Sequence, residues 1–393
     1  MDIAPAISVS HVPEYMPDLV RQGLQEVLAP LGGIGAFVSK GDVVLLKPNF
    51  LVARAVQKAV CTHPQVILGM AELALDAGAA EVLVGDSPAF GSCVGVVKKL
   101  GLADELKELG VHIAGFNDPV EAIHPDPGRY RRFEVDRAIL EVDKIINLVK
   151  VKTHGQMFMT LAVKNTFGYV VGTRKAAWHL EAGREEELFA TMLLDLHYFR
   201  APVLHVADGI VMMEGNGPGA GTVRNLGLLF AARDAVVMDR AICDVLSVPH
   251  SHVPTLRVAD REGYGVKADQ PVDWFGPALS DIRVEAIEHP RISHVGGLIT
   301  KRPLLRFTRR LIEVRPVVEK KACVGCKICQ QQCPAEAISM IGKRDGTLVA
   351  KIHPKLCIHC YCCQEICPEG AIVPRRGVIR SLLRRPEDSE ASF

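Results

Sequence analysis

The feature that most constrains this chain is a cysteine pattern that occurs twice near its C-terminal end. The spacing Cys-x2-Cys-x2-Cys-x3-Cys-Pro runs from Cys323 to Pro334 and again from Cys357 to Pro368. Three cysteines at this spacing form a tight loop whose thiolates converge on one cubane cluster, and the fourth reaches the other cluster. We therefore expect two 4Fe–4S clusters. The expected ligands are Cys323, Cys326, Cys329 and Cys367 for the first cluster, and Cys357, Cys360, Cys363 and Cys333 for the second.

Two other uses of these cysteines fit the pattern less well. Structural zinc sites typically take their ligands from two separated Cys-x2-Cys pairs, not from a run of three followed by Cys-Pro. Disulfides would imply a secreted scaffold, and nothing else in the chain suggests one. Cys362 is irregular because it lies between two expected ligands. It is either a spare ligand or, as we favour, a small apolar residue packed against the cluster.

The segment that carries the motifs resembles the bacterial two-cluster ferredoxin domain, a small α+β unit. We assign it to residues 321–375, after an α/β domain over 1–290 and a linker over 291–320, and before a tail of mixed charge over 376–393. The linker is basic and partly apolar, which is compatible with contact with a membrane surface or a partner. We favour the simpler interpretation, a helix that packs one domain on the other.

Composition argues against nucleic acid as a partner and against a secreted or membrane-spanning protein. The formal net charge of the 393 residues is +1, so no basic field indicates nucleic acid as a partner. The first residues lack the pattern of a secretory signal, and no apolar run is long enough to span a membrane. Because cluster ligands must be reduced thiolates, we expect a cytoplasmic protein of an organism that lives with little oxygen.

Residues 1–290 alternate short apolar runs with amphipathic helical patterns. This alternation predicts a mostly parallel open sheet with helices on both faces. The expected strands are 7–12, 42–47, 81–85, 111–114, 142–151, 203–206 and 226–230. The expected helices are 17–31, 62–76 with Thr62 as N-cap, 100–109, 157–167, 185–198 and 235–246, and 116–132 is expected to be a loop.

Polar residues follow several of these strands. In open parallel sheets, ligands bind beyond the carboxyl ends of the strands, so we expect these residues to form a ligand rim. Their cationic character suits a small anionic ligand. The expected ligand-binding residues are Lys47, Asn49, Lys150, Asn165, Asp208 and Gly217, and those expected to bind or protonate the ligand during catalysis are Lys152, His154 and Lys164.

Three further aspects of the rim stay open on sequence alone. The histidines His63 and His179 could reach it as well. The glycine-dense stretch 214–221 could approach a phosphate closely, although it lacks the spacing of known nucleotide motifs. The alternative role for Lys150 and Lys152 is a structural ion-pair network with Asp86 and Asp208.

Several of these stretches together resemble the family called domain of unknown function 362. They are LLKPN at 45–49, THP at 62–64, KVKTHGQMFMTLAVKNTFG at 150–168, KAAWH at 175–179, DG at 208–209 and EGNGPGAG at 214–221. The family is often fused to a two-cluster ferredoxin domain. The resemblance implies an α/β domain with a ferredoxin partner, and it implies no settled reaction.

The leading functional hypothesis is an iron–sulfur oxidoreductase that passes electrons between an external redox protein and a ligand at the rim. The alternative is a non-enzymatic electron carrier or maturation factor whose α/β domain docks a protein partner. A concave pocket with convergent Lys, His and Asn favours the first hypothesis. An exposed apolar patch near the clusters favours the second.

Overall fold

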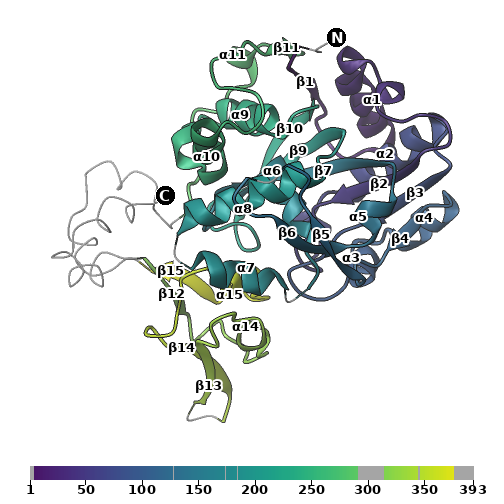
Figure 1. Ribbon diagram of the computed structural model, residues 1–393. Helices are drawn as coiled ribbons and strands as arrows, with labels where there is room; N and C mark the ends of the chain where they lie inside the picture. Colours follow the sequence, from purple (N-terminus) through teal and green to yellow (C-terminus); the bar gives the residue numbers. More distant parts are fainter. Residues whose placement is uncertain are drawn as a thin grey trace.

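The computed structural model describes residues 4–126, 128–172, 174–183, 185–290, 314–343 and 346–375. A large α/β part comes first along the chain, and a small part built from the C-terminal elements lies below it in Figure 1. The expected fold class is confirmed. The greater part of the predicted linker, 291–313, and the whole predicted tail, 376–393, lie outside the described residues.

The α/β part is organised around one mixed sheet with the order β11-β1-β10-β9-β7-β2-β3-β4, and β8 pairs with β7. Parallel pairs join β2 to β3 and β7, β7 to β9, β3 to β4, and β1 to β11. Among these strands, β10 and β8 run in the opposite direction to all the others. The strands are β1 (Ala6–His11), β2 (Val43–Pro48), β3 (Glu81–Gly85), β4 (His112–Ala114), β7 (Lys144–His154), β8 (Phe158–Thr160), β9 (Leu204–Glu214), β10 (Thr222–Ala232) and β11 (Asp273–Phe275).

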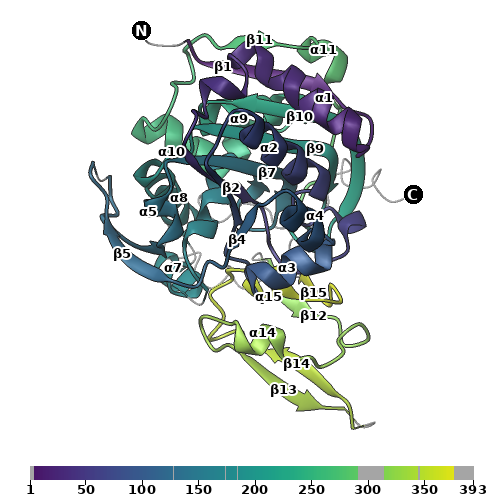
Figure 2. The ribbon, with the colours of Figure 1, turned by 90° about the vertical axis from the view of Figure 1, so that its right-hand side faces the viewer.

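Two hydrophobic cores lie on the two faces of the sheet. Side chains alternate along a strand, so Leu45 joins one core while Val44 and Leu46 join the other. Figure 2 shows α1, α2, α3 and α4 in front of the sheet, and these helices supply the core of Val44. They are α1 (Pro17–Leu28), α2 (Pro64–Asp76), α3 (Cys93–Leu100) and α4 (Ala103–Glu108). The helices of the other core include α6 (Ala162–Asn165), α8 (Glu186–Phe199), α9 (Ala235–Val245) and α10 (Pro254–Glu262).

Two expected segments fold differently from their prediction. The expected helix 157–167 is the short strand β8 followed by α6 and one 3-10 turn. Its apolar residues are buried without interruption, so their spacing does not mark a helix face. The expected loop 116–132 contains strand β5 (Pro119–Ile123), which forms a hairpin with β6 (Arg132–Asp136).

Three element ends also differ from their prediction. The N-cap of α2 is His63, whose Nδ1 accepts from the Gln65 N–H at 3.2 Å. Thr62 instead donates its hydroxyl to the Leu148 carbonyl at 2.8 Å. Strand β9 continues to Glu214, so Asp208 lies inside a strand rather than after one. The expected helix 100–109 is the shorter helix α4, which begins at Ala103 because Gly101 ends the preceding helix α3 in the left-handed conformation.

The C-terminal part repeats one backbone path. Residues with positive φ fall at matching places within the two cysteine runs, such as Lys327 after Cys326 and Tyr361 after Cys360. Two antiparallel strand pairs frame the repeat. The elements are β12 (Arg315–Val318), α14 (Ile328–Gln331), β13 (Ile338–Gly342), β14 (Leu348–Ile352), α15 (Cys362–Ile366) and β15 (Ile372–Arg375). The result is the small α+β unit expected from the motifs.

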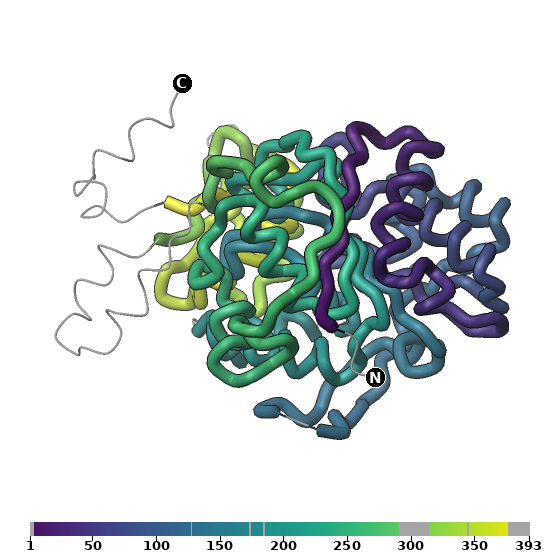
Figure 3. Tube along the Cα trace, turned by 90° about the horizontal axis from the view of Figure 1, so that it is seen from above, coloured from purple at the N-terminus to yellow at the C-terminus, as the bar shows by residue number. Residues whose placement is uncertain are grey.

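The two parts touch through α15 and its surroundings. Arg54 donates to the Cys367 carbonyl at 2.9 Å, and Gln364 donates to the Asn216 carbonyl at 3.2 Å. Figure 3, which views the molecule from above, shows the yellow-green C-terminal elements beside the teal elements of the middle of the chain. This junction positions the site described next.

Candidate functional site

The eight motif cysteines surround two cavities. The structure gathers Cys323, Cys326, Cys329 and Cys367 around one cavity, with about 360 Å³ of empty space. It gathers Cys333, Cys357, Cys360 and Cys363 around the other, with about 320 Å³. Each cavity therefore takes three cysteines from one run and the fourth from the other run, as in a two-cluster domain.

The surroundings of these cysteines fit an iron–sulfur cluster. The Ala337 N–H donates to the sulfur of Cys333 at 3.2 Å, and the Ala371 N–H donates to that of Cys367 at 3.3 Å. Hydrogen bonds to cluster sulfurs tune the reduction potential, and here the two halves place them at matching positions. Among the described residues, no three His, Cys, Asp or Glu side chains converge so as to hold a single metal ion. The eight cysteines are spread around the two cavities instead.

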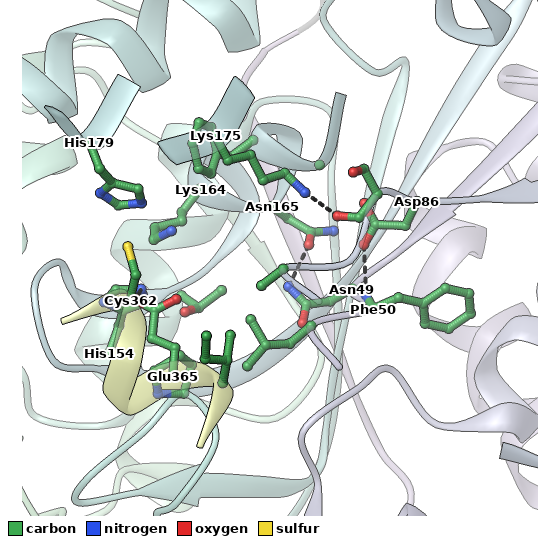
Figure 4. A pocket seen from close by; sticks show the side chains of 18 of the residues that line it. Asn49, Phe50, Asp86, His154, Lys164, Asn165, Lys175, His179, Cys362 and Glu365 are labelled. Atoms are coloured by element: carbon green, nitrogen blue, oxygen red, sulfur yellow. Dashed lines mark hydrogen bonds and ion pairs between the residues drawn. The ribbon is translucent and has the colours of Figure 1, made fainter. Parts of the chain in front are cut away.

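A third and larger hollow lies between the sheet rim and α15, and we call it the interdomain pocket (Figure 4). It has about 790 Å³ of empty space. Most of its wall comes from residues that follow β2 and β3, from the C-terminal end of β7, from α6, and from α7 (Arg174–Ala182). The C-terminal part contributes Gln332, Cys362, Glu365 and Ile366 to the wall.

Helix α15 has one face toward the interdomain pocket and another toward the second cysteine cavity. Cys362, Glu365 and Ile366 line the pocket, whereas Cys363 lines the cavity. Residues three and four apart share a helix face, which explains why 362, 365 and 366 point together. Cys362 therefore lines the interdomain pocket and neither cysteine cavity, while its thiol also contacts that of Cys360, an expected cluster ligand. Its packing against the cluster stays a prediction.

Three lysines give the interdomain pocket its positive charge. Lys152 is fully buried and donates to the Asn49 Oδ1 at 2.7 Å and the Val60 carbonyl at 2.6 Å. Lys164 lies with its ammonium over the rings of Phe167 and Phe189. Lys175 donates to the backbone carbonyl of Ser87. None of these contacts is with a carboxylate.

Burial changes the acidity of these lysines. An ammonium loses hydration when it is buried, so its charged form becomes less stable. Desolvation lowers the pKa of Lys152 to about 7 and that of Lys175 to about 7. It lowers the pKa of Lys164 as well. Lys152 and Lys175 can thus gain or lose a proton near neutral pH.

Opposite these cations stands Glu365 of α15. Its Oε1 lies 3.0 Å from the Nε2 of His154, and both side chains are buried. His154 accepts the N–H groups of Gln156 and Met157 at its Nδ1, so in the neutral ring the proton sits on Nε2, the ring nitrogen that is nearer Glu365. Burial acts to raise the pKa of Glu365, but His154 and Lys164 lower it to about 2. Glu365 is therefore a carboxylate at neutral pH.

Other polar groups complete the wall. His179 is buried and stacks on Phe189 with ring centroids 4.4 Å apart, and burial lowers its pKa to about 3. Asn49 donates to the Asn165 Oδ1 at 2.6 Å. Asn165 in turn donates to the Asn147 Oδ1 at 2.7 Å. This chain of amides runs inward from Lys152 and fixes both its orientation and that of Asn165.

The structure brings together only part of the expected ligand rim. Asn49, Lys152, His154, Lys164 and Asn165 line the interdomain pocket, as does His179. Lys47, Lys150, Asp208, Gly217 and His63 do not.

Most of the excluded residues have structural partners instead. Lys47 pairs with Asp86 at 2.9 Å, and Lys150 pairs with Asp208 at 2.8 Å, with all four side chains buried. The ion-pair alternative therefore holds for Lys150 but not for Lys152. His63 stacks on Tyr15, with ring centroids 3.5 Å apart.

The glycine-dense stretch lies against protein backbone. A Cβ at Gly217 would sit 2.1 Å from the Thr153 carbonyl oxygen, and one at Gly219 would sit 2.4 Å from that of Glu365. Close backbone approach is a reason for glycine, and here it lets the turn between β9 and β10 fit between β7 and α15. Pro218 is the residue of this turn that reaches the pocket wall.

Sequence reasoning missed the contribution of the C-terminal part. Glu365, Cys362 and Ile366 line the pocket because α15 packs against the rim of the sheet. These residues are three and four positions apart, which predicts a shared helix face that differs from the face of Cys363. Nothing in the sequence indicated what that face would meet.

Taken together, the fold and the site define an iron–sulfur protein whose α/β domain shares a pocket with its cluster domain. The chain belongs to the family described as domain of unknown function (DUF362), whose model matches residues 44–244. A 4Fe-4S dicluster domain matches residues 322–371. The predicted family and the iron–sulfur character are confirmed, so the C-terminal part binds 4Fe–4S clusters and has an electron-transfer role. The assignment of individual cysteines stays a prediction.

A relative supports the same membership. The chain is 38% identical over 258 residues to a protein of Synechocystis named thylakoid-associated protein, covering 66% of this chain and 79% of that one. No helix among the described residues is long and apolar enough to cross a membrane.

Two solved structures show weak similarity. One is a Thermotoga maritima protein with a TM-score of 0.32 and 12% identity, matching 50% of this chain and 51% of that one. The other is the lactate racemase apoprotein of Thermoanaerobacterium thermosaccharolyticum, with a TM-score of 0.41 and 11% identity, matching 61% of this chain and 57% of that one. The chain thus spans little more than half of each, and similarity this low has no bearing on function.

Proposed function

We propose that this chain is an oxidoreductase that binds a small organic anion in the interdomain pocket and exchanges electrons with an external redox protein. The observation that carries the proposal is the position of α15. One face of this helix lines the pocket and the other lines the second cysteine cavity. A ligand in the pocket would lie about one helix diameter, on the order of 10 Å, from that cavity.

The charges of the pocket support an anionic ligand. Lys152, Lys164 and Lys175 face it, while Asp86 is already paired with Lys47. Glu365 is thus the one acidic side chain of the described wall that is left to balance three ammonium groups. Buried charges are stable only when they are paired, so an anion that entered would supply the missing partner.

The same lysines support proton transfer to the ligand. A general acid works best when its pKa lies near the working pH, and burial brings Lys152 and Lys175 to about 7. Asn49 and Asn165 would hold Lys152 in place through the amide chain. When bound, the clusters would supply single electrons, which is their ordinary chemistry.

The test uses anaerobically purified full-length protein that carries its clusters. Calorimetric titration with inorganic phosphate and with a series of small carboxylates should detect binding of at least one anion. The dithionite-reduced protein should then be reoxidised by a carboxylate that is a substrate, seen as recovery of absorbance near about 400 nm, where iron–sulfur centres absorb. If no anion binds and none restores the absorbance, the oxidoreductase proposal is wrong.

A second candidate function, electron carriage without a substrate, has its own support. Val324 is 65% exposed and lines the first cysteine cavity, and Leu348, which is 40% exposed, lies beside the neighbouring Gly325. Exposed apolar side chains next to a redox centre suit docking of a redox protein. Replacing Val324 with glutamate should slow reduction by such a partner. In the carrier case no anion would bind the pocket.

We also propose a peripheral contact with membranes. The support is the name of the Synechocystis relative, together with the basic residues of the linker. Sedimentation with anionic lipid vesicles at low and high salt tests it, because electrostatic attachment should be lost at high salt.

A further inference from the structure

A ligand of the interdomain pocket must carry a hydrogen-bond donor for Glu365 as well as a negative charge for the lysines. The Glu365 side chain is 9% exposed, and its carboxylate points toward the same space as Lys164 and His179 in Figure 4. Within the described part of the chain, the Glu365 Oε1 atom has an ion-pair contact with His154 but makes no hydrogen bond of good geometry. A buried acceptor without a hydrogen bond costs stability unless water or a ligand supplies a donor.

His154 fills this need only in part. Its Nε2 lies 3.0 Å from the Glu365 Oε1, but the contact lacks hydrogen-bond geometry. The ring is held in place because its Nδ1 accepts two backbone N–H groups. The Nδ1 of His179, on the same wall, also lacks a hydrogen-bond partner among the described residues. The wall thus offers unused acceptor and donor positions beside its cations.

A plain anion fits such a wall poorly. Its negative group would bind the lysines, but any second negative or acceptor group near Glu365 would meet a carboxylate in a buried setting. A site with buried polar groups rejects a ligand that leaves them unpaired. Apolar members of the wall, among them Phe50, Leu51 and Ile366, suit a carbon skeleton rather than a bare inorganic ion.

Resting on the proposed function, we propose that Glu365 sets the substrate class. The pocket takes a small organic acid that bears a hydroxyl or amino group close to its carboxylate. The lysines bind the carboxylate, and Glu365 accepts the hydrogen bond of the hydroxyl or amino group. Acids without such a donor, and inorganic phosphate, bind more weakly.

The experiment compares two dicarboxylates that differ by one hydroxyl group, malate and succinate. Both are titrated calorimetrically into the anaerobic full-length protein with its clusters. Malate should bind at least about tenfold more tightly, because a buried carboxylate gains a charge-assisted hydrogen bond from the hydroxyl. In Glu365→Gln the preference should fall below about threefold, because a neutral amide is a weaker acceptor than a carboxylate for the hydroxyl group of malate.

The control is Glu319→Gln, which removes the same charge from an exposed position of the same part of the chain. It should keep the preference of the parent protein, and the iron content of all three proteins should be equal. Equal binding of malate and succinate by the parent overturns the role of Glu365 while leaving the anion pocket standing. An unchanged preference in Glu365→Gln also contradicts the role of Glu365 and leaves the anion pocket standing. If the parent protein binds neither acid and no phosphate, the anion pocket itself is contradicted.

Discussion

Replacing Lys150 and Lys152 separately with methionine should separate a structural lysine from a ligand-binding one. The two residues lie on the same strand, and both are fully buried. Lys150 pairs with Asp208 at 2.8 Å, whereas Lys152 donates only to the amide of Asn49 and the carbonyl of Val60. The same substitution at two neighbouring positions therefore removes two different kinds of interaction.

The loss of stability should be larger for Lys150→Met. Removing one partner of a buried ion pair typically costs about 3–5 kcal/mol, because the remaining charge has no counterion. Asp208 would keep the Tyr15 hydroxyl at 2.6 Å and the His63 N–H at 2.9 Å, which places the cost near the lower end. Lys152→Met leaves two neutral acceptors without a donor, at about 1–3 kcal/mol, and relieves the desolvation of an unpaired ammonium.

The loss of ligand affinity should have the opposite order. A charge-assisted hydrogen bond contributes about 1.5–3 kcal/mol, so Lys152→Met should weaken binding of the tightest-binding anion by about 10- to 150-fold. Lys150→Met should change that affinity little, since Lys150 does not line the pocket. Urea unfolding of the anaerobic proteins gives the first quantity and calorimetry the second. If Lys150→Met loses affinity while keeping its stability, the division of roles between the two lysines is wrong.

Three further predictions concern the clusters and the charge of the pocket. Anaerobically purified protein should contain about eight irons and eight sulfides, and stoichiometric zinc without absorbance near about 400 nm would contradict the cluster assignment. Cys333→Ala should damage the cluster held mainly by the second cysteine run, because Cys333 lines the cavity of that run. Electron paramagnetic resonance distinguishes the two clusters. Damage to the first cluster instead would contradict the exchange of the fourth cysteine between the runs. Anion affinity should fall as the pH rises through about 7, the pKa of Lys152 and Lys175, because both lysines then lose their protons. The affinity is measured from pH 6 to 8, about one unit either side of that pKa. A constant affinity over this range would show that neither lysine binds the anion.

The sequence predicted the fold class because its local patterns were consistent. The strand of Val43 to Pro48 and the helix after His63 each carry a clear signal in their own residues. The segment after β7 carried a misleading signal: all of its apolar residues are buried, so their spacing does not indicate a single helix face. Local pattern cannot distinguish a buried short strand from a buried helix.

The candidate site was predictable only in part, for two physical reasons. Lys150 and Lys152 should share a face of a regular strand, but the pairing of β7 with β9 shifts its register between them. That irregularity leaves one lysine beside Asp208 and the other in the pocket wall. The second reason is docking between the two parts of the chain. Glu365 gains its role from packing against residues more than a hundred positions away, and no local pattern specifies such a contact.

The last prediction uses the two faces of α15. Cys362 lines the pocket and Cys363 lines the second cysteine cavity, although they are adjacent in sequence. Cys363→Ala should therefore remove about four of about eight irons, whereas Cys362→Ala should keep all of them. Cys362→Ala should instead change anion affinity by about 2- to 12-fold, the effect of one neutral hydrogen bond of about 0.5–1.5 kcal/mol.

Iron analysis and calorimetry on the same two proteins decide the matter. If iron is lost from Cys362→Ala and retained in Cys363→Ala, the second motif has a different register and α15 must present the opposite face to the pocket. Glu365 lies on the Cys362 face, so its place in the pocket depends on the same register. A change of register would therefore contradict both the position of Glu365 in the pocket wall and the assignment of Cys363 to the second cluster, because both depend on the orientation of α15.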